Sequence, residues 1–369
     1  MIDESLFKSE ERAVFALRSL YKKYGYQPFK MSKFEEYELY LKNKDFLISD
    51  RIISFSDTNG KLMALKPDVT LSVIKNGEDL PGYKQKVYYN ENVYRVSGST
   101  HQYKEIMQTG IECIGKLDGY DVFEVLSLAA KSLACISGDY VLDVSHLGIL
   151  TALLDEAGCS AELRKEIARC IAGRNSHDLE RACVSGGVPP AMREKICAFN
   201  RIYGDMDQVL ERLEPVCTGE RTGSALEELK ALRRLIKGEP FEGHVFFDFS
   251  IVNDMDYYNG VVFKGFLQGI CEGVLAGGQY DKLMEKMGRS SRAIGFALYL
   301  DLLEGLRDGG REYDVDVLLL YDAAVPAKKT AAAVRELLAQ GKSVSAQKAV
   351  PPRLRYRELL DIREEGSSC

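Results

Sequence analysis

Hydrophobic and polar residues alternate along residues 247 to 303, in the second half of the chain. The alternation is typical of half-buried antiparallel strands, and it pauses at Gly277 and Gly278. An apolar run from 293 to 303 closes the stretch and predicts a strand that leads into a helix. Two glycines are most typical of a turn, but they also let the backbone approach a bound molecule closely. We therefore expect this stretch to build part of a binding pocket.

The first part of the chain shows both helical and strand periodicity. Apolar residues at helical spacing predict amphipathic helices over residues 5–24 and 120–136. Between them, two alternating runs flank Asn59 and Gly60, and an Asn-Gly pair between strands predicts a β-hairpin.

The middle of the chain changes character. A strand is expected over 140–150, and its His146 is more typical of a structural role, because a general base needs an oriented partner. Short amphipathic helices separated by Gly and Pro are predicted over 150–240, as an insertion into a core domain that spans 1–310. A β-α-β pattern then predicts a second, small α/β unit over 311–369.

Composition limits the class of protein. The 369 residues are 46% hydrophobic and 28% charged, as in an ordinary globular protein, and the formal net charge of -6 disfavours a nucleic-acid partner. Nine cysteines without a C-x-x-C pair, and only four histidines, favour reduced thiols in a cytoplasmic protein over a metal site. The charged N-terminus does not resemble a signal peptide, and no apolar run is long enough for a membrane span. We expect no metal, no cofactor and no membrane contact.

Six segments, in this order, resemble the signature motifs of the class II histidyl-tRNA synthetases. They are residues 25–40, 66–70, 87–115, 251–263, 277–288 and 293–303. The resemblance implies an α+β fold, in which helices flank an antiparallel sheet, with a helical insertion and a truncated C-terminal unit like the start of an anticodon-binding domain. The first motif forms the homodimer interface in that family, so a homodimer is expected, although Ser32 replaces the usual proline.

The same resemblance implies a histidine pocket. Asp68 takes the place of the glutamate that meets the α-amino group, Thr70 keeps a hydroxyl, and Arg95 stands where the family has an arginine for the α-phosphate and carboxylate. Gln108 and Glu112 share one face if their segment is a strand. By themselves, these two residues also fit a solvated strand face, and Asp68 or Thr70 also fits a helix N-cap. The predicted histidine-binding residues are Asp68, Thr70, Arg95, Gln108, Glu112, Tyr257 and Tyr258.

Three positions depart from the synthetase pattern on the ATP side. Asn253 and Leu302 replace arginines, and Ser97 replaces a glutamate. Neither Asn nor Leu offers a guanidinium group to phosphate oxygens. We expect the amino-acid pocket to be kept and adenylate formation to be lost.

This combination resembles the regulatory subunits of ATP phosphoribosyltransferase, which are paralogues of the synthetases. The resemblance implies no catalytic residues, a partnership with the short-form catalytic subunit in a hetero-oligomer, and feedback by L-histidine in histidine biosynthesis. An active histidine–tRNA ligase, favoured by Arg95, and a tRNA-mimicking regulator remain as alternatives. Pyrophosphate exchange and tRNA filter binding would separate these alternatives from the regulatory function.

Overall fold

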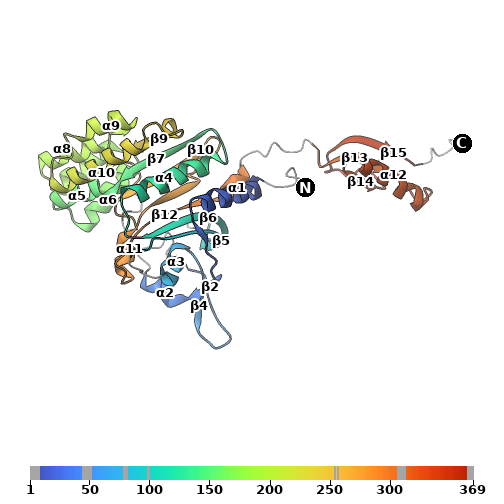
Figure 1. The fold of residues 1–369 in the computed structure, drawn as a ribbon, viewed down its shortest axis with the longest axis horizontal. Coiled ribbons are helices and arrows are strands. Elements are labelled where there is room, and N and C mark those ends of the chain that lie inside the picture. The colour runs from blue at the N-terminus through green and yellow to red at the C-terminus, as the bar shows by residue number, and fades with distance from the viewer. Residues whose placement is uncertain are drawn as a thin grey trace. The chain divides into compact units, whose positions relative to one another are not determined.

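A computed structural model gives the structure of the protein (Figure 1), and it describes residues 9–43, 52–77, 82–97, 100–252, 255, 257–305 and 313–363. The chain divides into two compact units, Met1–Leu306 and Arg307–Cys369. Each unit is described separately below.

A nine-stranded, mostly antiparallel sheet is the centre of the first unit. Its spatial order is β1-β5-β6-β12-β11-β10-β7-β9-β8, and the β1–β5 and β7–β9 pairs are parallel. The strands in that order are β1 (Gln27–Pro28), β5 (Gln85–Val96), β6 (Tyr103–Gly115), β12 (Arg292–Tyr299), β11 (Leu275–Gln279), β10 (Val261–Leu267), β7 (Tyr140–His146), β9 (Val245–Asp248) and β8 (Tyr203–Gly204). The mixture of helices with an antiparallel sheet confirms the predicted α+β class.

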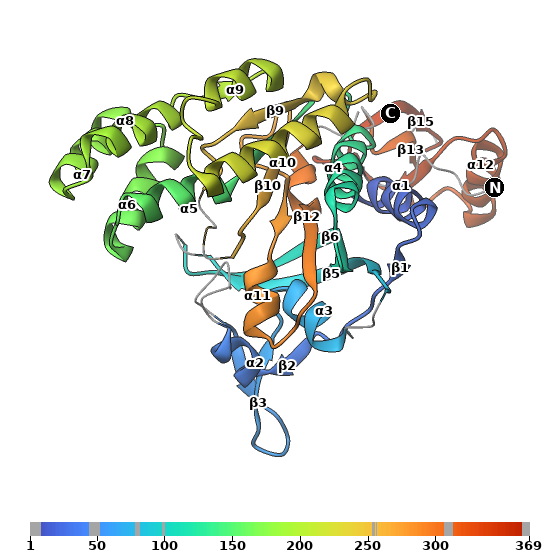
Figure 2. The same ribbon diagram turned by 60° about the vertical axis from the view of Figure 1, so that its left-hand side comes forward.

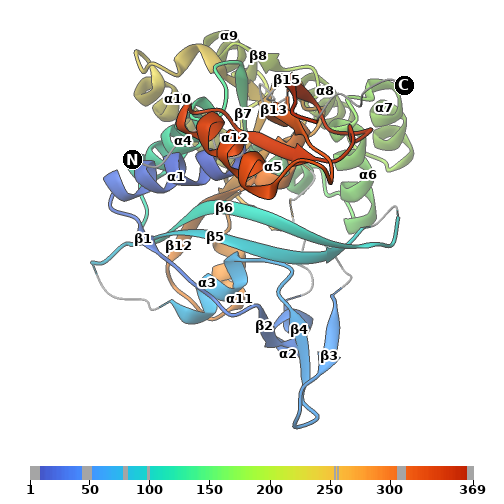
Figure 3. The ribbon, with the colours of Figure 1, turned by 90° about the vertical axis from the view of Figure 1, so that its right-hand side faces the viewer.

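Helices cover both faces of the part of the sheet formed by β5, β6 and β12. α1 (Ser9–Lys23) and α4 (Gly119–Ala134) lie on one face, whereas α3 (Thr70–Asn76) and α11 (Asp281–Lys286) lie on the other (Figure 3). Successive side chains of a strand point to opposite faces of the sheet. In β6, Ile111 therefore joins the core beneath α1 and α4, and Glu112 points to the opposite face. Helices were predicted at α1 and α4, and the described residues confirm them.

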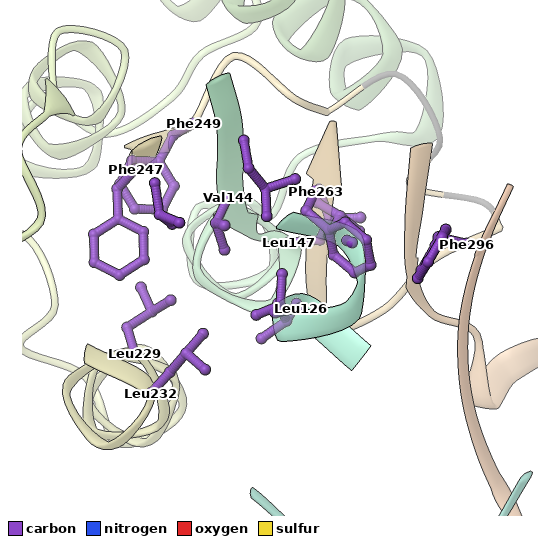
Figure 4. Close-up of a cluster of buried hydrophobic side chains, with 14 of the residues drawn as sticks. Leu126, Val144, Leu147, Leu229, Leu232, Phe247, Phe249, Phe263 and Phe296 are labelled. Carbon is purple, nitrogen blue, oxygen red and sulfur yellow. The ribbon is translucent and has the colours of Figure 1, made fainter. Parts of the chain in front are cut away.

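The main hydrophobic core fills the space between the sheet and the helices α4 and α10 (Glu220–Ile236). Figure 4 shows Leu229 and Leu232 of α10 beneath Phe247 of β9, with Leu126 of α4 near Phe263 of β10. These side chains are almost fully buried. Removing any one of them would therefore leave a cavity in a close-packed interior.

A group of helices follows β7 and lies together at one end of the unit (Figure 2). They are α5 (Leu147–Glu156), α6 (Ala161–Ala172), α7 (Ser176–Ser185), α8 (Pro190–Phe199), α9 (Met206–Leu213) and α10, and the short helix η3 (Glu242–His244) leads back to the sheet. The helical character predicted for 150–240 is confirmed. The strand predicted to reach residue 150 was wrong, because it ends at His146, whose Nδ1 accepts a hydrogen bond from the Gly148 N–H at 3.2 Å and caps α5.

A small antiparallel sheet, β2-β4-β3, stands apart from the large one. It comprises β2 (Phe34–Glu36), β3 (Ser54–Ser56) and β4 (Leu62–Leu65), and the short helix α2 (Tyr37–Lys42) follows β2. The β3–β4 hairpin confirms the Asn59-Gly60 prediction, and Gly60 has the positive φ of 79° that such a turn needs. β4 leads into the segment before α3, and so brings residues 66–70 to the large sheet.

The predicted pause at Gly277 and Gly278 was wrong. Both glycines lie inside β11, paired with β10 and β12, and the 3-10 helix η4 (Leu300–Gly305) follows β12. A Cβ at Gly277 would lie 2.5 Å from the Phe296 Cβ, and one at Gly278 would lie 2.9 Å from the Tyr258 Cδ1. Neighbouring protein atoms, rather than a ligand, therefore account for the missing side chains.

The second unit is a three-stranded parallel sheet in the order β14-β13-β15 with one helix. The elements are β13 (Val315–Leu320), α12 (Ala327–Ala339), β14 (Val344–Gln347) and β15 (Tyr356–Asp361). The β-α-β order was predicted, and β15 was not. The assignment of this unit as an anticodon-binding remnant, and the domain limits 1–310 and 311–369, stay predictions.

Candidate functional site

A cavity lies on the face of β6 and β12 that is opposite α4. The space between its lining residues, with the adjoining open solvent included, is about 400 Å³. Its lining comes from segments far apart in the chain: the start of α3, the strands β5, β6, β11 and β12, the residues just before β10, and the residue just after β11. The lining residues are Asp68, Val69, Thr70, Tyr89, Arg95, Gln108, Glu112, Tyr257, Tyr258, Ala276, Tyr280, Gly295, Phe296, Ala297 and Tyr299.

Glu112 lies in the floor of this cavity and is only 2% exposed. Its Oε1 accepts a hydrogen bond from the Thr70 hydroxyl at 2.7 Å, and its Oε2 accepts one from the Tyr280 hydroxyl at 2.6 Å. Burial raises the pKa of Glu112 to about 8, because an apolar surrounding penalises the charged form more than the two hydrogen bonds favour it. At neutral pH this carboxyl is therefore mainly in its protonated form.

Asp68 and Arg95 form the charged wall of the cavity. Asp68 Oδ1 accepts a hydrogen bond from the Leu71 N–H at 3.0 Å, so its side chain satisfies a backbone donor in the first turn of α3 while it lines the cavity. Arg95 Nε donates to the Pro67 carbonyl at 2.9 Å, which holds the guanidinium near Asp68. Burial raises the pKa of Asp68, while the charge of Arg95 and the N–H groups of α3 act in the opposite direction.

Gln108 brings a buried amide to the same cavity. It lies four residues before Glu112 on β6 and is 3% exposed, so the shared face is confirmed and the solvated strand face was the wrong alternative. Its Nε2 is buried without a hydrogen-bond partner in the described part of the protein. A buried donor without an acceptor is costly, so this amide indicates a position for an acceptor atom of a ligand.

Aromatic rings form the remaining wall. Tyr257 and Tyr258 pack edge to face with ring centroids 4.6 Å apart, and Tyr280 lies 5.9 Å from Tyr257. Burial raises the pKa of Tyr257 and of Tyr280 far above the ordinary value, so both phenols are neutral. Neutral rings with hydroxyl groups suit a flat, polar ligand group such as an imidazole.

Gly295 of β12 leaves the space that Glu112 occupies. The two residues face each other across the β6–β12 pair, and a Cβ built at Gly295 would lie 1.8 Å from the Glu112 Oε2. The position of Glu112 therefore depends on the absence of a side chain at residue 295.

The structure brings all seven predicted site residues into one cavity. Reasoning from the sequence missed Tyr89, Tyr280, Tyr299 and Gly295. Tyr280 stands in the Gly-Gly-Gln-Tyr-Asp motif, which was a usable signal, whereas nothing local in the sequence marks Gly295.

The three replaced synthetase positions have other surroundings. Leu302 packs against the main core, and Ser97 accepts a hydrogen bond from the Thr100 N–H at 3.3 Å in the turn after β5. Neither residue lines the cavity. Asn253 lies outside the described residues.

A second, wider cavity adjoins the first and shares Tyr258, Ala276 and Tyr299 with it. Lys264 is the one charged residue among the described residues that line it. A single lysine binds a triphosphate weakly, because a triphosphate usually requires several cationic groups or metal ions.

The described residues contain no cluster of His, Cys, Asp and Glu side chains able to hold a metal ion, and their eight cysteines are free thiols. Every helix among them is too short or too polar to cross a membrane.

Comparison with known proteins assigns the chain to a family. The sequence profile described as histidyl-tRNA synthetase matches residues 2–303 of the chain. The chain belongs to the histidyl-tRNA synthetase family. The α+β fold expected from the motifs is therefore confirmed at the level of the family as well as the structure.

Related sequences in this family are named ATP phosphoribosyltransferase regulatory subunit. The protein of that name from Oceanobacillus iheyensis is 24% identical over 353 residues, which cover 92% of this chain and 87% of the relative. The one from Desulfitobacterium hafniense is 28% identical over 306 residues, or 80% of this chain and 76% of the relative.

Solved structures share the fold. An ATP phosphoribosyltransferase regulatory subunit/histidyl-tRNA synthetase from Bacillus halodurans C superimposes with a TM-score of 0.75 at 21% identity and covers 99% of this chain and 97% of its own. A chain of the ATP phosphoribosyl transferase (HisG:HisZ) complex from Thermotoga maritima gives a TM-score of 0.62 at 22% identity, over 80% of this chain and 98% of its own.

Proposed function

We propose that this protein is the regulatory subunit of ATP phosphoribosyltransferase and has no aminoacylation activity. It assembles with the short-form catalytic subunit in the cytoplasm, activates the first step of histidine biosynthesis, and lowers that activity when L-histidine is bound. The observation that carries the proposal is that relatives matching most of this chain bear this name. The named complex of the Thermotoga maritima neighbour supports a catalytic partner.

L-histidine occupies the cavity in this proposal. Asp68 accepts from the α-amino group, Arg95 meets the carboxylate, and Glu112 and Gln108 reach the imidazole ring beside the tyrosines. The chemistry supports this assignment: a carboxylate binds an ammonium group, a guanidinium group binds a carboxylate, and the unpartnered Gln108 amide can donate to the ligand. Histidine bound at these contacts can change the activity of the catalytic subunit only if a coupling free energy links the two subunits.

Amino-acid activation is excluded on chemical grounds in this proposal. Leu302 and Asn253 replace two phosphate-binding arginines, and the cavity next to Tyr258 holds one lysine among its described lining residues. Each missing donor to a developing charge costs about 3 kcal/mol of transition-state stabilisation, or a factor of 10² to 10³ in rate. Two such losses reduce adenylate formation to a negligible rate.

The test measures phosphoribosyl-ATP formation by a short-form catalytic subunit from the same source. The subunit is assayed alone, with this protein, and with this protein plus L-histidine. A large increase on addition of the protein, reversed by L-histidine, is the expected result. An unchanged rate on addition would contradict the proposal.

A matched pair of glycine variants separates activation from feedback. Gly295→Ala forces Glu112 out of the cavity floor, so it should activate the catalytic subunit but respond weakly to L-histidine. Gly223→Ala in α10 is the control, because its Cβ meets only the Cys217 carbonyl at 3.8 Å, an ordinary contact distance. Loss of the histidine response in both variants would contradict the proposed position of the histidine.

A homodimer within the hetero-oligomer is part of the proposal. Light scattering of the isolated protein should give twice the chain mass of 41.3 kDa. A mass equal to that of one chain would contradict a homodimer of the isolated protein.

One observation favours a second candidate, histidine–tRNA ligase. Arg95 lines the cavity, and the motif resemblance assigns it to the arginine that binds the α-phosphate in the synthetases. Histidine-dependent pyrophosphate exchange at high protein concentration would support this activity, and its absence would end the candidate.

A further inference from the structure

The charges that line the histidine cavity do not balance. Among the described lining residues, Asp68 and Glu112 are acidic, and Arg95 is the one cation. Arg95 acts on the Asp68 end: burial raises the pKa of Asp68, the charge of Arg95 opposes that rise, and the Arg95 Nε donates a hydrogen bond to the neighbouring Pro67 carbonyl. The amino and carboxylate groups of an amino acid would be matched at this end, and the Glu112 end would still lack a positive charge.

No cation faces Glu112 from the described elements packed around it. The segment that leads into α3 presents Asp68 and Thr70, and β5 presents Tyr89. β12 presents the backbone of Gly295 opposite Glu112, and the Tyr299 ring at the position paired with Gln108. Tyr280 precedes α11 and donates to Glu112, and Tyr257 precedes β10. The buried phenols of Tyr89, Tyr257 and Tyr280 have raised pKa values and stay neutral across the physiological range. Burial, with a smaller contribution from the charge of Asp68, raises the pKa of Glu112 to about 8.

We propose that this cavity binds L-histidine with its imidazole ring protonated, as an ion pair with Glu112, so that binding is coupled to the proton of this carboxyl. The inference rests on the proposed function, because it requires histidine in the cavity. At neutral pH the Glu112 O–H bond breaks and an imidazole N–H bond forms, so the proton passes from the protein to the ligand. The carboxylate then accepts charge-assisted hydrogen bonds, which are about twice as strong as neutral ones.

The proton balance sets how affinity depends on pH. Between the ordinary imidazole pKa of about 6.5 and the Glu112 pKa of about 8, neutral histidine meets a protonated carboxyl, and no net proton is exchanged with solvent. Above about 8 both partners have lost the proton and one must be taken up, so affinity falls about tenfold per pH unit. Below about 6.5 the ligand is already charged and Glu112 must release its proton, so affinity falls again. The cavity therefore selects amino acids whose side chain can carry a positive charge.

Isothermal titration calorimetry of the full-length protein tests this coupling. Histidine is titrated at pH 8.5 in two buffers of different ionisation enthalpy, and the difference in heat gives the number of protons taken up. The wild-type protein should take up about three quarters of a proton more than Glu112→Gln, because a carboxyl with a pKa of about 8 is still roughly one quarter protonated at pH 8.5 and the glutamine amide exchanges no proton. The comparison removes any contribution from the α-amino group, which both proteins share.

An equal proton uptake by wild-type protein and Glu112→Gln would overturn the proton coupling and leave histidine binding itself established. No binding heat for the wild-type protein at any pH would overturn the proposed histidine site together with this inference. The two failures are therefore distinguishable.

A ligand-side experiment covers the case in which Glu112→Gln does not fold. 1,2,4-Triazole-3-alanine has the shape of histidine, but its ring takes up no proton in this pH range. We expect it to bind the wild-type protein at least about tenfold more weakly than histidine at pH 7, because the ion pair cannot form. Equal affinities for the two ligands would overturn the inference.

Discussion

Replacing Gly295 by alanine adds a single methyl group at the point where the cavity is tightest. The new Cβ would lie 1.8 Å from the Glu112 Oε2 and 2.5 Å from the Ile111 carbonyl oxygen, both far inside contact distance. The carboxylate can move only by giving up its hydrogen bonds to Thr70 and Tyr280. The substitution therefore perturbs the packing of the floor and its polar network at the same time.

Three effects set the size of the change in the free energy of unfolding. Overpacking a buried position costs about 1–3 kcal/mol. Two lost hydrogen bonds to Glu112 cost about 1 kcal/mol each. The restricted backbone of alanine in a strand returns about 0.5–1 kcal/mol. We expect Gly295→Ala to be less stable by about 2–4 kcal/mol, which a protein of ordinary stability survives in the folded state.

Urea denaturation followed by far-UV circular dichroism measures this change, since the sequence contains no tryptophan for fluorescence. Histidine affinity is measured in parallel and should fall at least about tenfold. The Gly223→Ala control should be unchanged or more stable by about 1 kcal/mol, because alanine favours a helix over glycine. A Gly295→Ala protein with wild-type stability and histidine affinity would refute this account of the cavity floor.

Three further substitutions test other parts of the structure. The pKa of Glu112 is raised from 4.5 to about 8, so the folded state binds more protons than the unfolded state between these two pH values. Without histidine, the free energy of unfolding should therefore fall as pH rises through this window, by up to about 1.4 kcal/mol per pH unit. Urea titrations at several pH values should show a weaker pH dependence of the free energy of unfolding for Glu112→Gln than for the wild-type protein. The same pH dependence in both proteins would contradict the raised pKa of Glu112. Asp118→Ala removes the capping box of α4 and should cost about 1 kcal/mol in thermal unfolding, with Asp118→Asn close to wild type. Lys66→Met leaves Glu91 without its buried partner at 2.5 Å and should cost about 3 kcal/mol, which the double substitution with Glu91→Gln should largely restore.

Local signals in the sequence predicted most of the elements. The Asn59-Gly60 pair predicted the hairpin because the turn requires a positive φ that few residues adopt. The β-α-β pattern of the second unit was equally clear, but β15 was missed, because its charged and exposed residues lack the apolar alternation of a half-buried strand. The boundary at His146 was missed for a different reason: the apolar residues on both sides are buried, and a continuous apolar run does not distinguish strand from helix.

The candidate site was predicted through the motifs and not through physical chemistry alone. Asp68 and Glu112 are 44 positions apart, and the tertiary fold brings them to one cavity, with Glu112 on β6 and Asp68 in the segment before α3. Tyr280 and Gly295 were missed because each contributes only through its contact with Glu112, which the sequence does not show. Tyr280 matters as the donor to Glu112, and Gly295 matters through the space it leaves for the same side chain.

The floor of the cavity also limits how this protein can evolve. Gly295 and Gly110 both lie where another strand or side chain approaches too closely for a methyl group, with the would-be Cβ of Gly110 at 2.1 Å from the Phe296 carbonyl oxygen. Every missense change at a glycine codon adds at least a Cβ, so a substitution at either position costs stability whatever its effect on a ligand. Changes in ligand preference are therefore less costly in the cavity walls, where Asp68, Tyr257 and Tyr258 belong to the segments between strands and helices.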